Sequence, residues 1–389
     1  MLGAIIGDII GSTYEVEEVL ALKQSPNKKR SYNERIAILN KETPLFLNES
    51  SYTDDTVLTS AIANALIDNH PFEENLRKYG LEEISLGKDK YGRSRFGKGF
   101  VSWLKKETEG NSFGNGAAMR ISPIAHYYDD LQIILEKTKE ATIPSHNHED
   151  AITGAQAVTT AIYLAKNNYS KQEIKEEIER RFNYNLNFNL EELQHNYRFT
   201  SQSSESVPQA IYCFLESTSF EDCIRKSISI GGDTDTITAI SCSIAECFYG
   251  IPEETKQQVL PYIPPKYKKT IDEFYSIVYL KQQLLALNIC HDEFWEYMRT
   301  RTKRLNAKIE TGIWGTFTKN DSQGNLINIR IIVPEIVDEK TLLINIHEYA
   351  HAYELYQELG TKYKPNIDQS EAYAVSKEKE YLLQKKVYE

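Results

Sequence analysis

Two short acidic clusters, far apart in the chain, constrain its fold more than any other feature. In residues 231–236 two glycines precede two aspartates one residue apart, and residues 53–56 contain two adjacent aspartates. Each cluster stands directly before an apolar run with helical spacing, which predicts that both lie at helix starts. Four carboxylates that meet in space repel one another, and a hard divalent cation such as Mg²⁺ offsets that repulsion through oxygen ligands. The sequence therefore predicts helices that converge on a metal site.

Helix capping explains either cluster alone better than metal binding does, because Asp and Thr are favoured N-cap residues. A cap needs only one side-chain oxygen, whereas Asp54 with Asp55, and Asp233 with Asp235, supply more than one each. The surplus oxygen favours metal binding.

Residues 1–285 are predicted to be mostly helical, with almost no strands. Gly3, Gly7 and Gly11 recur at four-residue spacing in the first apolar run, which permits close approach to a neighbouring backbone. The stretch from Gly11 to Glu15 is expected to end that helix. Helices are predicted at 2–10, from 53 to about 70, at 151–166, at 220–230 and at 237–248.

A change of pattern predicts a second, smaller α+β unit over residues 286–389. A charged helix is expected at 293–308. Two strand-like segments, 311–318 and 326–333, are joined by a polar turn and predict a hairpin. A further helix is expected at 342–359.

Composition argues against several classes of partner. The formal net charge of −11 disfavours a broad surface for nucleic acid or anionic lipid. The apolar opening is short and interrupted by Asp8, so it does not resemble a signal peptide, and no stretch approaches a membrane span. Five cysteines without Cys-x-x-Cys spacing predict reduced thiols in a cytoplasmic protein. The oligomeric state is not predictable from these patterns.

Six short motifs, in order along residues 1–250, resemble the ADP-ribosylglycohydrolases, including the dinitrogenase reductase-activating glycohydrolase. The motifs are Gly7-Asp8-Ile9-Ile10-Gly11-Ser12-x-Tyr14-Glu15, Tyr52-Thr53-Asp54-Asp55-Thr56, Gly114-Asn115-Gly116-x-Ala118-Met119-Arg120, Ser145-His146-x-His148, Gly154-Ala155-Gln156-Ala157 and Gly231-Gly232-Asp233-x-Asp235-Thr236.

The resemblance implies an all-α fold that binds two Mg²⁺ or Mn²⁺ ions and removes ADP-ribose from a modified protein or small-molecule acceptor. In that scheme paired ions bind the distal ribose hydroxyls and activate a water. The implied ion ligands are Thr53, Asp54, Asp55, Asp233, Asp235 and Thr236, and three of them, Asp54, Asp55 and Asp235, are also implied to act in catalysis.

The resemblance assigns further roles outside the ion ligands. Glu15 matches a glutamate that gates the site or orients the water, with a solvent-facing loop acid as the alternative. Asp8 is expected to support the ligands. His146 is a candidate ligand contact, whereas His148 is equally explained as a helix cap. The implied diphosphate and ribose loop comprises Gly114, Asn115, Gly116 and Met119.

A second motif lies in the tail, where His347-Glu348-x-x-His351 places two imidazoles on one helix face. The composition of this chain gives only about 0.02 such motifs by chance. The tail resembles the gluzincin metallopeptidases, in which a downstream glutamate completes a Zn²⁺ site. Glu371 is the predicted third ligand and Glu348 the predicted general base. Two rivals for the third ligand are Glu378 and Glu380.

Two alternatives remain open. The first unit is also explained as a module that binds ADP-ribose without cleaving it. The tail either carries the main activity, as a zinc peptidase, or merely bears two surface histidines.

Overall fold

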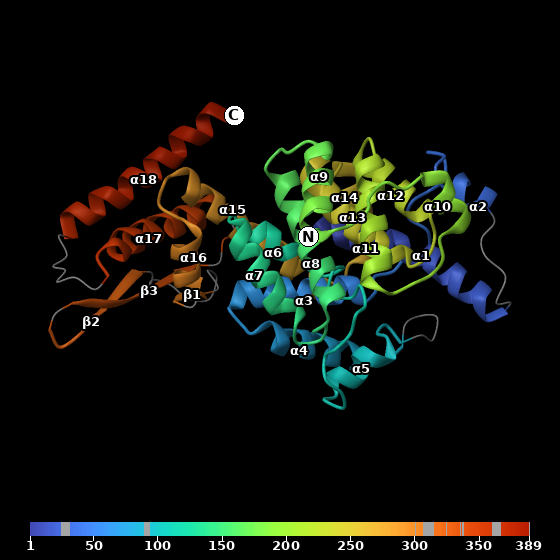
Figure 1. Ribbon diagram of the computed structural model, residues 1–389. Coiled ribbons are helices and arrows are strands. Elements are labelled where there is room, and N and C mark those ends of the chain that lie inside the picture. The colour runs from blue at the N-terminus through green and yellow to red at the C-terminus, as the bar shows by residue number, and fades with distance from the viewer. Residues whose placement is uncertain are drawn as a thin grey trace. The chain divides into compact units, whose positions relative to one another are not determined.

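The computed structural model describes residues 1–24, 32–88, 94–299, 301–305, 315–323, 325–334, 336, 338–359 and 367–388 (Figure 1). Two compact units divide the chain, Met1–Ile271 and Asp272–Glu389. The division falls inside helix α15 (Pro265–Ala286). The sequence places the boundary at the end of that helix, at 285/286, and this domain limit stays a prediction.

The first unit is mainly helical, as predicted. It contains α1 (Leu2–Gln24), α2 (Tyr32–Ala37), α3 (Asp54–Asp68), α4 (Phe72–Ser85), α5 (Lys98–Leu104), α6 (Ser122–Tyr127), α7 (Leu131–Thr142), α8 (Glu149–Lys166), α9 (Lys171–Phe182), α10 (Leu190–Asn196), α11 (Ser203–Glu216), α12 (Phe220–Ser229), α13 (Thr234–Tyr249), α14 (Glu253–Val259) and the 3₁₀ helix η1 (Leu260–Tyr262).

Helices α1 and α13 pack against each other in this unit. Cβ atoms added to Gly3, Gly7 and Gly11 would lie 2.3, 2.3 and 2.4 Å from backbone carbonyl oxygens of α13. The predicted close approach is therefore confirmed. The predicted helix end at Gly11 is wrong, because α1 continues to Gln24. The low helix propensity of glycine is offset by this contact.

A glycine pair separates α12 from α13, as predicted. Gly231 and Gly232 have φ angles of +75° and +79°, which favour glycine over residues with a Cβ atom. A Cβ atom on Gly232 would also lie 2.6 Å from a ring carbon of Tyr197. The pair thus ends one helix and turns the chain so that Asp233 and Asp235 begin the next.

The second unit contains a three-stranded sheet in the order β1-β3-β2. Strand β3 (Leu326–Pro334) pairs in parallel with β1 (Thr302–Leu305) and antiparallel with β2 (Gly315–Asn320). The β2–β3 pair confirms the predicted hairpin, although residues 311–314 of its first segment lie outside the described residues.

Three helices accompany the sheet: α16 (Asp292–Arg299), α17 (Glu339–Gln357) and α18 (Ile367–Tyr388). The predicted helix at 293–308 is wrong at Thr302–Leu305, where the chain forms β1 and its main chain pairs with β3, and residues 300 and 306–308 of the predicted helix lie outside the described residues. Tertiary pairing overrides the local charge pattern. Helix α17 packs on β3 and carries the paired histidines.

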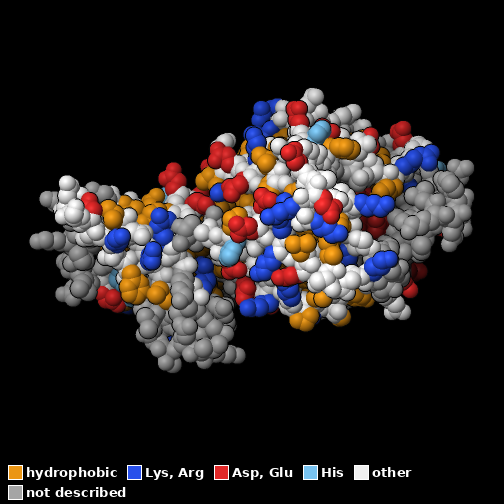
Figure 2. Space-filling view, turned by 90° about the horizontal axis from the view of Figure 1, so that it is seen from below, with side chains coloured by type: hydrophobic (Ala, Val, Ile, Leu, Met, Phe, Trp, Pro, Cys, Tyr) orange, Lys and Arg blue, Asp and Glu red, His pale blue; other side chains and the backbone are white. Residues whose placement is uncertain are grey.

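Acidic and basic side chains are interspersed on the face of the molecule shown in Figure 2. Among the helices that the structure describes, none has both the length and the hydropathy of a bilayer-spanning segment.

Candidate functional site

The two acidic clusters predicted from the sequence meet in the first unit. Carboxylate oxygens of Asp8, Asp55 and Asp235 lie within 4.8 Å of one another, and so do those of Glu15, Asp233 and Asp235. The five side chains come from α1, from α3 and from the start of α13. Asp235 belongs to both groups and joins them.

Asp8 fixes the start of α3 within this cluster. Its carboxylate accepts hydrogen bonds from the backbone N–H of Thr53 at 3.0 Å and of Thr56 at 3.0 Å. The Thr53 hydroxyl also donates to Asp8, at 2.7 Å, while it caps α3 by accepting from the N–H of Asp55 at 3.3 Å. Thr53, one of the residue types favoured at a cap, is thus the N-cap of α3, and Asp8 both supports the cluster and belongs to it.

Burial and mutual repulsion of the negative charges raise the pKa values of carboxyl groups in the cluster. Burial and, next, the charge of Asp235 raise the pKa of Asp8 to about 7. Burial and neighbouring aspartates raise the pKa of both Asp55 and Asp233 well above the ordinary value. Asp55 Oδ1 is buried, and none of the residues that the structure describes donates a hydrogen bond to it. A cation would satisfy that oxygen and restore the ionised state of the group.

The remaining predicted ligands border the cluster. Asp54 is half-buried and belongs to neither group of three, although burial and neighbouring aspartates raise its pKa as well. Thr236 donates through its hydroxyl to Asp55 Oδ2 at 3.4 Å and through its N–H to Asp235 Oδ1 at 2.8 Å. Thr236 therefore bridges the two acidic clusters.

The predicted substrate loop is tied directly to the acidic cluster. Asn115 donates through Nδ2 to Asp233 Oδ2 at 2.8 Å, and Met119 Sδ lies 3.7 Å from the hydroxyl of Thr236. Gly114 forms an isolated β-bridge with Gln202. These contacts place Asn115 and Met119 beside the acidic cluster, and the role of the loop in substrate binding stays a prediction.

His146 lies buried behind the same loop. A Cβ atom on Gly116 would lie 3.0 Å from His146 Nε2, so glycine leaves room for the ring. Its Nδ1 lies 2.7 Å from Ser145 Oγ, which accepts from Arg120 at 2.7 Å. Burial and the charge of Arg120 hold the pKa of His146 well below its usual range, so the ring is neutral.

The cap assigned to His148 is confirmed, because its Nδ1 accepts from the N–H of Asp150 at 3.2 Å. His148 also meets the ring of Phe113 edge-on, with centroids 5.8 Å apart. Phe113 is 49% exposed and directly precedes the loop residues Gly114, Asn115 and Gly116. The sequence reasoning missed it, although an aromatic residue directly before Gly114 was a usable signal.

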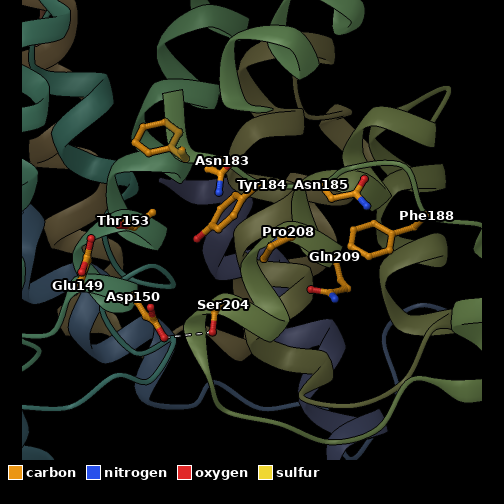
Figure 3. A pocket seen from close by; sticks show the side chains of 11 residues that line it. Glu149, Asp150, Thr153, Asn183, Tyr184, Asn185, Phe188, Ser204, Pro208 and Gln209 are labelled. Atoms are coloured by element: carbon orange, nitrogen blue, oxygen red, sulfur yellow. Dashed lines mark hydrogen bonds between the residues drawn. The ribbon is translucent and has the colours of Figure 1, made fainter. Parts of the chain in front are cut away.

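A cavity of about 580 Å³ lies elsewhere in the first unit, lined by residues of α8, of α11 and of the segment 182–188 (Figure 3). Asp150 and Ser204 approach to 3.2 Å at its wall. None of the residues predicted for the ion site or the substrate loop lines this cavity.

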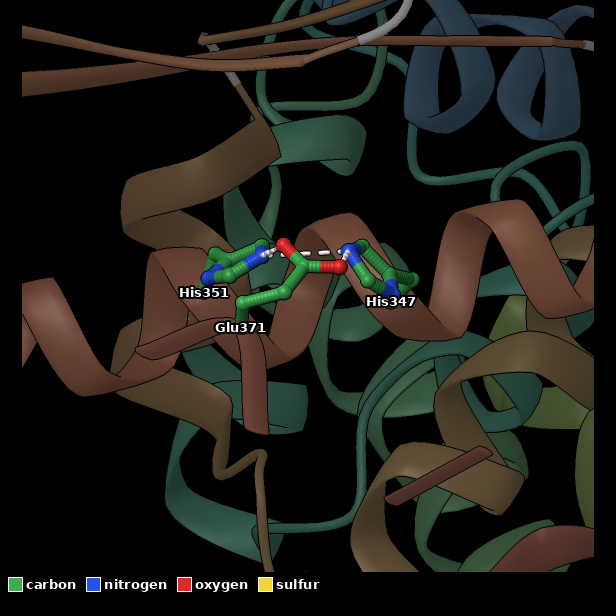
Figure 4. Close-up of side chains that lie close together, drawn as sticks. All are labelled: His347, His351 and Glu371. Carbon is green, nitrogen blue, oxygen red and sulfur yellow. Dashed lines mark hydrogen bonds and ion pairs between the residues drawn. The ribbon is translucent and has the colours of Figure 1, made fainter. Parts of the chain in front are cut away.

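The second unit holds a separate cluster that is built from α17 and α18. His347 Nε2 and His351 Nε2 lie 3.1 Å apart, and the Glu371 carboxylate approaches them at 3.5 and 3.3 Å (Figure 4). The three side chains offer ligand atoms within 4.8 Å of one another. Two imidazoles and one carboxylate form a donor set that suits Zn²⁺.

Other residues orient this second cluster. His347 Nδ1 lies 2.8 Å from Glu378, and His351 Nδ1 lies 2.7 Å from Ser370 Oγ. Glu348 accepts from the Thr316 hydroxyl at 2.8 Å. Of the three glutamates considered as third ligand, only Glu371 faces both Nε2 atoms. Glu378 contacts Nδ1 of His347 instead. Glu380 pairs with Lys377 at 2.9 Å.

Known proteins resemble the first unit. ADP-ribosylhydrolase ARH3 of Mus musculus is 25% identical over 324 residues, which cover 66% of this chain and 85% of that protein. ARH3 of Homo sapiens is 26% identical over 327 residues, 67% and 88% of the two chains. ADP-ribosylarginine hydrolase Tri1 of Pseudomonas putida is 22% identical over 270 residues, 64% and 70%.

A solved ADP-ribosylglycohydrolase-related protein complex has a chain with the same fold, at 18% identity and a TM-score of 0.50, covering 71% of this chain and 93% of that one. The family model for ADP-ribosylglycohydrolase matches residues 1–289, the larger part of the 389 residues. The chain therefore belongs to the ADP-ribosylglycohydrolase family.

Proposed function

We propose that residues 1–285 form a hydrolase that depends on Mg²⁺ or Mn²⁺ and releases ADP-ribose from an ADP-ribosylated protein or small-molecule acceptor. Family membership supports the reaction class. The observation that carries the cation dependence is the buried, donorless Asp55 Oδ1 among carboxylates whose pKa values are raised. A cluster of this kind is costly to keep ionised unless a cation binds.

The two groups of three carboxylates, which share Asp235, are proposed to hold two ions. Thr53, Asp54 and Thr236 complete the oxygen ligands in this proposal. When bound, such ions supply positive charge for the distal ribose hydroxyls and Lewis-acid activation of a water.

The protein supplies position and charge. Asn115 bonds both Asp233 and the carbonyl of Ser201, so the glycine loop that faces the diphosphate is fixed relative to the cluster. Glu15, at the half-buried edge of the cluster, is proposed to orient the attacking water. The carboxylates of Asp55 and Asp235 tolerate the positive charge that develops on the ribose carbon as the glycosidic bond breaks.

The experiment is a release assay with a panel of acceptors, including ADP-ribosylated arginine and serine. The purified chain is incubated with each acceptor and Mg²⁺, with and without chelator. Cation-dependent appearance of free ADP-ribose supports the proposal. Binding of ADP-ribose that is lost in Asp233→Ala, with no release from any acceptor, would instead support a binding module.

A second proposed activity belongs to the tail. The convergence of His347, His351 and Glu371, with Glu348 held by Thr316, supports a zinc peptidase in which Glu348 is the general base. Zinc content of the purified full-length chain tests it. About one zinc per chain that is lost in His347→Ala supports the site, and a zinc-free chain after loading and dialysis contradicts it.

The setting of these activities is also proposed. Free cysteines, four of the five buried, favour the cytoplasm, where ADP-ribosylated proteins and metabolites would be the partners.

A further inference from the structure

The backbone that leads into each acidic cluster is held by a buried or largely buried arginine. Arg35 donates to the carbonyl of Ile230 at 2.6 Å, directly before the glycine pair and Asp233. Arg95 donates to the carbonyl of Tyr52 at 2.8 Å, directly before Thr53. Neither arginine is among the proposed ion ligands.

Arg35 joins three segments that are remote in the sequence. It lies on α2, which contacts α10 and α12 (Figure 1). One nitrogen, Nη1, also approaches the carbonyls of Gln194 and Tyr197 at 3.2 and 3.3 Å. The Tyr197 ring in turn covers Gly232. Arg35 therefore restrains the glycine turn both from its preceding carbonyl and through the ring above it.

Arg95 acts on the other cluster through a buried carboxylate. Its Nε pairs with Glu83 at 2.6 Å, and its guanidinium lies 4.1 Å from the ring centroid of Tyr52. Glu83 also accepts from the Tyr52 and Tyr267 hydroxyls at 2.9 and 2.8 Å. Both the side chain and the carbonyl of Tyr52 are thus fixed one residue before the first predicted ligand.

We propose that Arg35 and Arg95 are positioning residues that set the cation affinity of the acidic site by fixing the two peptides that carry its ligands. Repulsion among the carboxylates favours any movement that separates the clusters, and the arginines oppose it at the two points of entry. A cation binds best when its ligands are already held in place. This inference rests on the proposed cation site.

The chain offers matched controls. Arg77 resembles Arg95, because its side chain is 16% exposed against 17%, it lies 4.0 Å from the Trp103 ring centroid, and it bonds the carbonyl of Leu104. Arg225 resembles Arg35, because it is buried and donates to several backbone carbonyls, four in its case, the nearest being that of Ile38 at 2.9 Å. Neither control holds a residue next to an acidic cluster.

The test titrates Mg²⁺ into the full-length chain by calorimetry, without substrate, and records thermal unfolding in chelator. Mg²⁺ is chosen because the tail histidines are poor ligands for it. Arg35→Met and Arg95→Met are expected to weaken Mg²⁺ binding about 10- to 100-fold, the range for groups that orient ligands. Arg225→Met and Arg77→Met are expected to lower the unfolding temperature similarly, with Mg²⁺ affinity within about twofold of wild type.

Arg35→Lys is expected to recover part of the affinity, because an ammonium still donates to the Ile230 carbonyl. The pair Arg35→Lys and Arg225→Lys repeats the comparison if the methionine variants do not fold. Equal losses in test and control variants, or no Mg²⁺ binding by wild type, would overturn the inference. Wild type that binds Mg²⁺ but releases no ADP-ribose would overturn the proposed hydrolase and leave the positioning inference standing.

Discussion

The two candidate metal sites differ in the ligand atoms that they offer and in their burial. The site in the first unit uses only oxygen atoms, is mostly buried, and gathers its ligands from α1, α3 and α13. The site in the second unit uses two ring nitrogens and one exposed carboxylate, from α17 and α18. Oxygen-only donors suit hard ions that keep water and substrate oxygens, whereas imidazole suits Zn²⁺.

The difference also concerns what holds the ligands in place. In the first unit the carboxylates repel one another, so the fold must hold them together, through the bonds of Asp8 and the packing of glycines. In the second unit each imidazole is oriented from behind by one side chain, Glu378 or Ser370. We therefore expect the first site to respond to changes throughout its unit and the second to respond mainly to its immediate neighbours.

The largest expected effect is the loss of one site while the other persists. Asp55→Ala removes the donorless oxygen and is expected to lower Mg²⁺-dependent ADP-ribose release by more than about 100-fold, beyond the effect of losing a supporting group. Zinc content of the chain should not change. The matched control is Asp68→Ala, an exposed acid on the same helix, which should retain release. Zinc loss in Asp55→Ala would show that the sites are not independent.

The next prediction concerns Glu378, which contacts His347 in the second site. Glu378→Gln keeps all three ligand atoms but weakens the partner of His347 Nδ1, so Zn²⁺ affinity should fall about 10- to 100-fold. Competition with a chromophoric chelator measures it. Glu380→Gln, on the same helix but paired with Lys377, is the control and should bind as wild type does. Equal affinity in both variants would mean that Glu378 is a surface neighbour only.

A change at the contact between α1 and α13, at a residue that offers no ligand atom itself, distinguishes the units next. Gly7→Ala places a Cβ atom 2.3 Å from the Thr238 carbonyl and forces α1 away from α13. We expect a loss of about 1–3 kcal/mol in the free energy of unfolding of the first unit, measured by denaturant titration, with weaker Mg²⁺ binding and unchanged zinc content. Gly99→Ala, in a helix with open space around it, should be neutral or stabilising. Unchanged Mg²⁺ affinity in Gly7→Ala would contradict the dependence of the first site on packing.

The sequence predicted what depends on local rules. The cap at Thr53, the break at Gly231 and Gly232, and the histidine pair on one helix face follow from residue type and spacing. The meeting of the two acidic clusters was predictable from their surplus of carboxylates, but most other contacts between remote segments were not. The sequence does not distinguish Arg35 from the other arginines, because its contact with the Ile230 carbonyl depends on where α2 lies. Helix α1 continues past Gly11 because it packs against α13.

The smallest expected effect is a pH dependence of the stabilisation by Mg²⁺. The pKa of Asp8 rises from 3.8 to about 7 on folding, so between these values the folded chain holds a proton that the unfolded chain has released. Without cation, this group therefore makes the free energy of unfolding fall as pH rises through that window. Mg²⁺ competes with the proton, so the gain in unfolding temperature between chelator and Mg²⁺ should grow from pH 4 to pH 7. The same scan in Asp55→Ala should show little gain at any pH. A gain in unfolding temperature that is constant with pH would mean that the cation does not displace protons from this cluster. Proton competition would then not distinguish the carboxylate site of the first unit from the histidine site of the second.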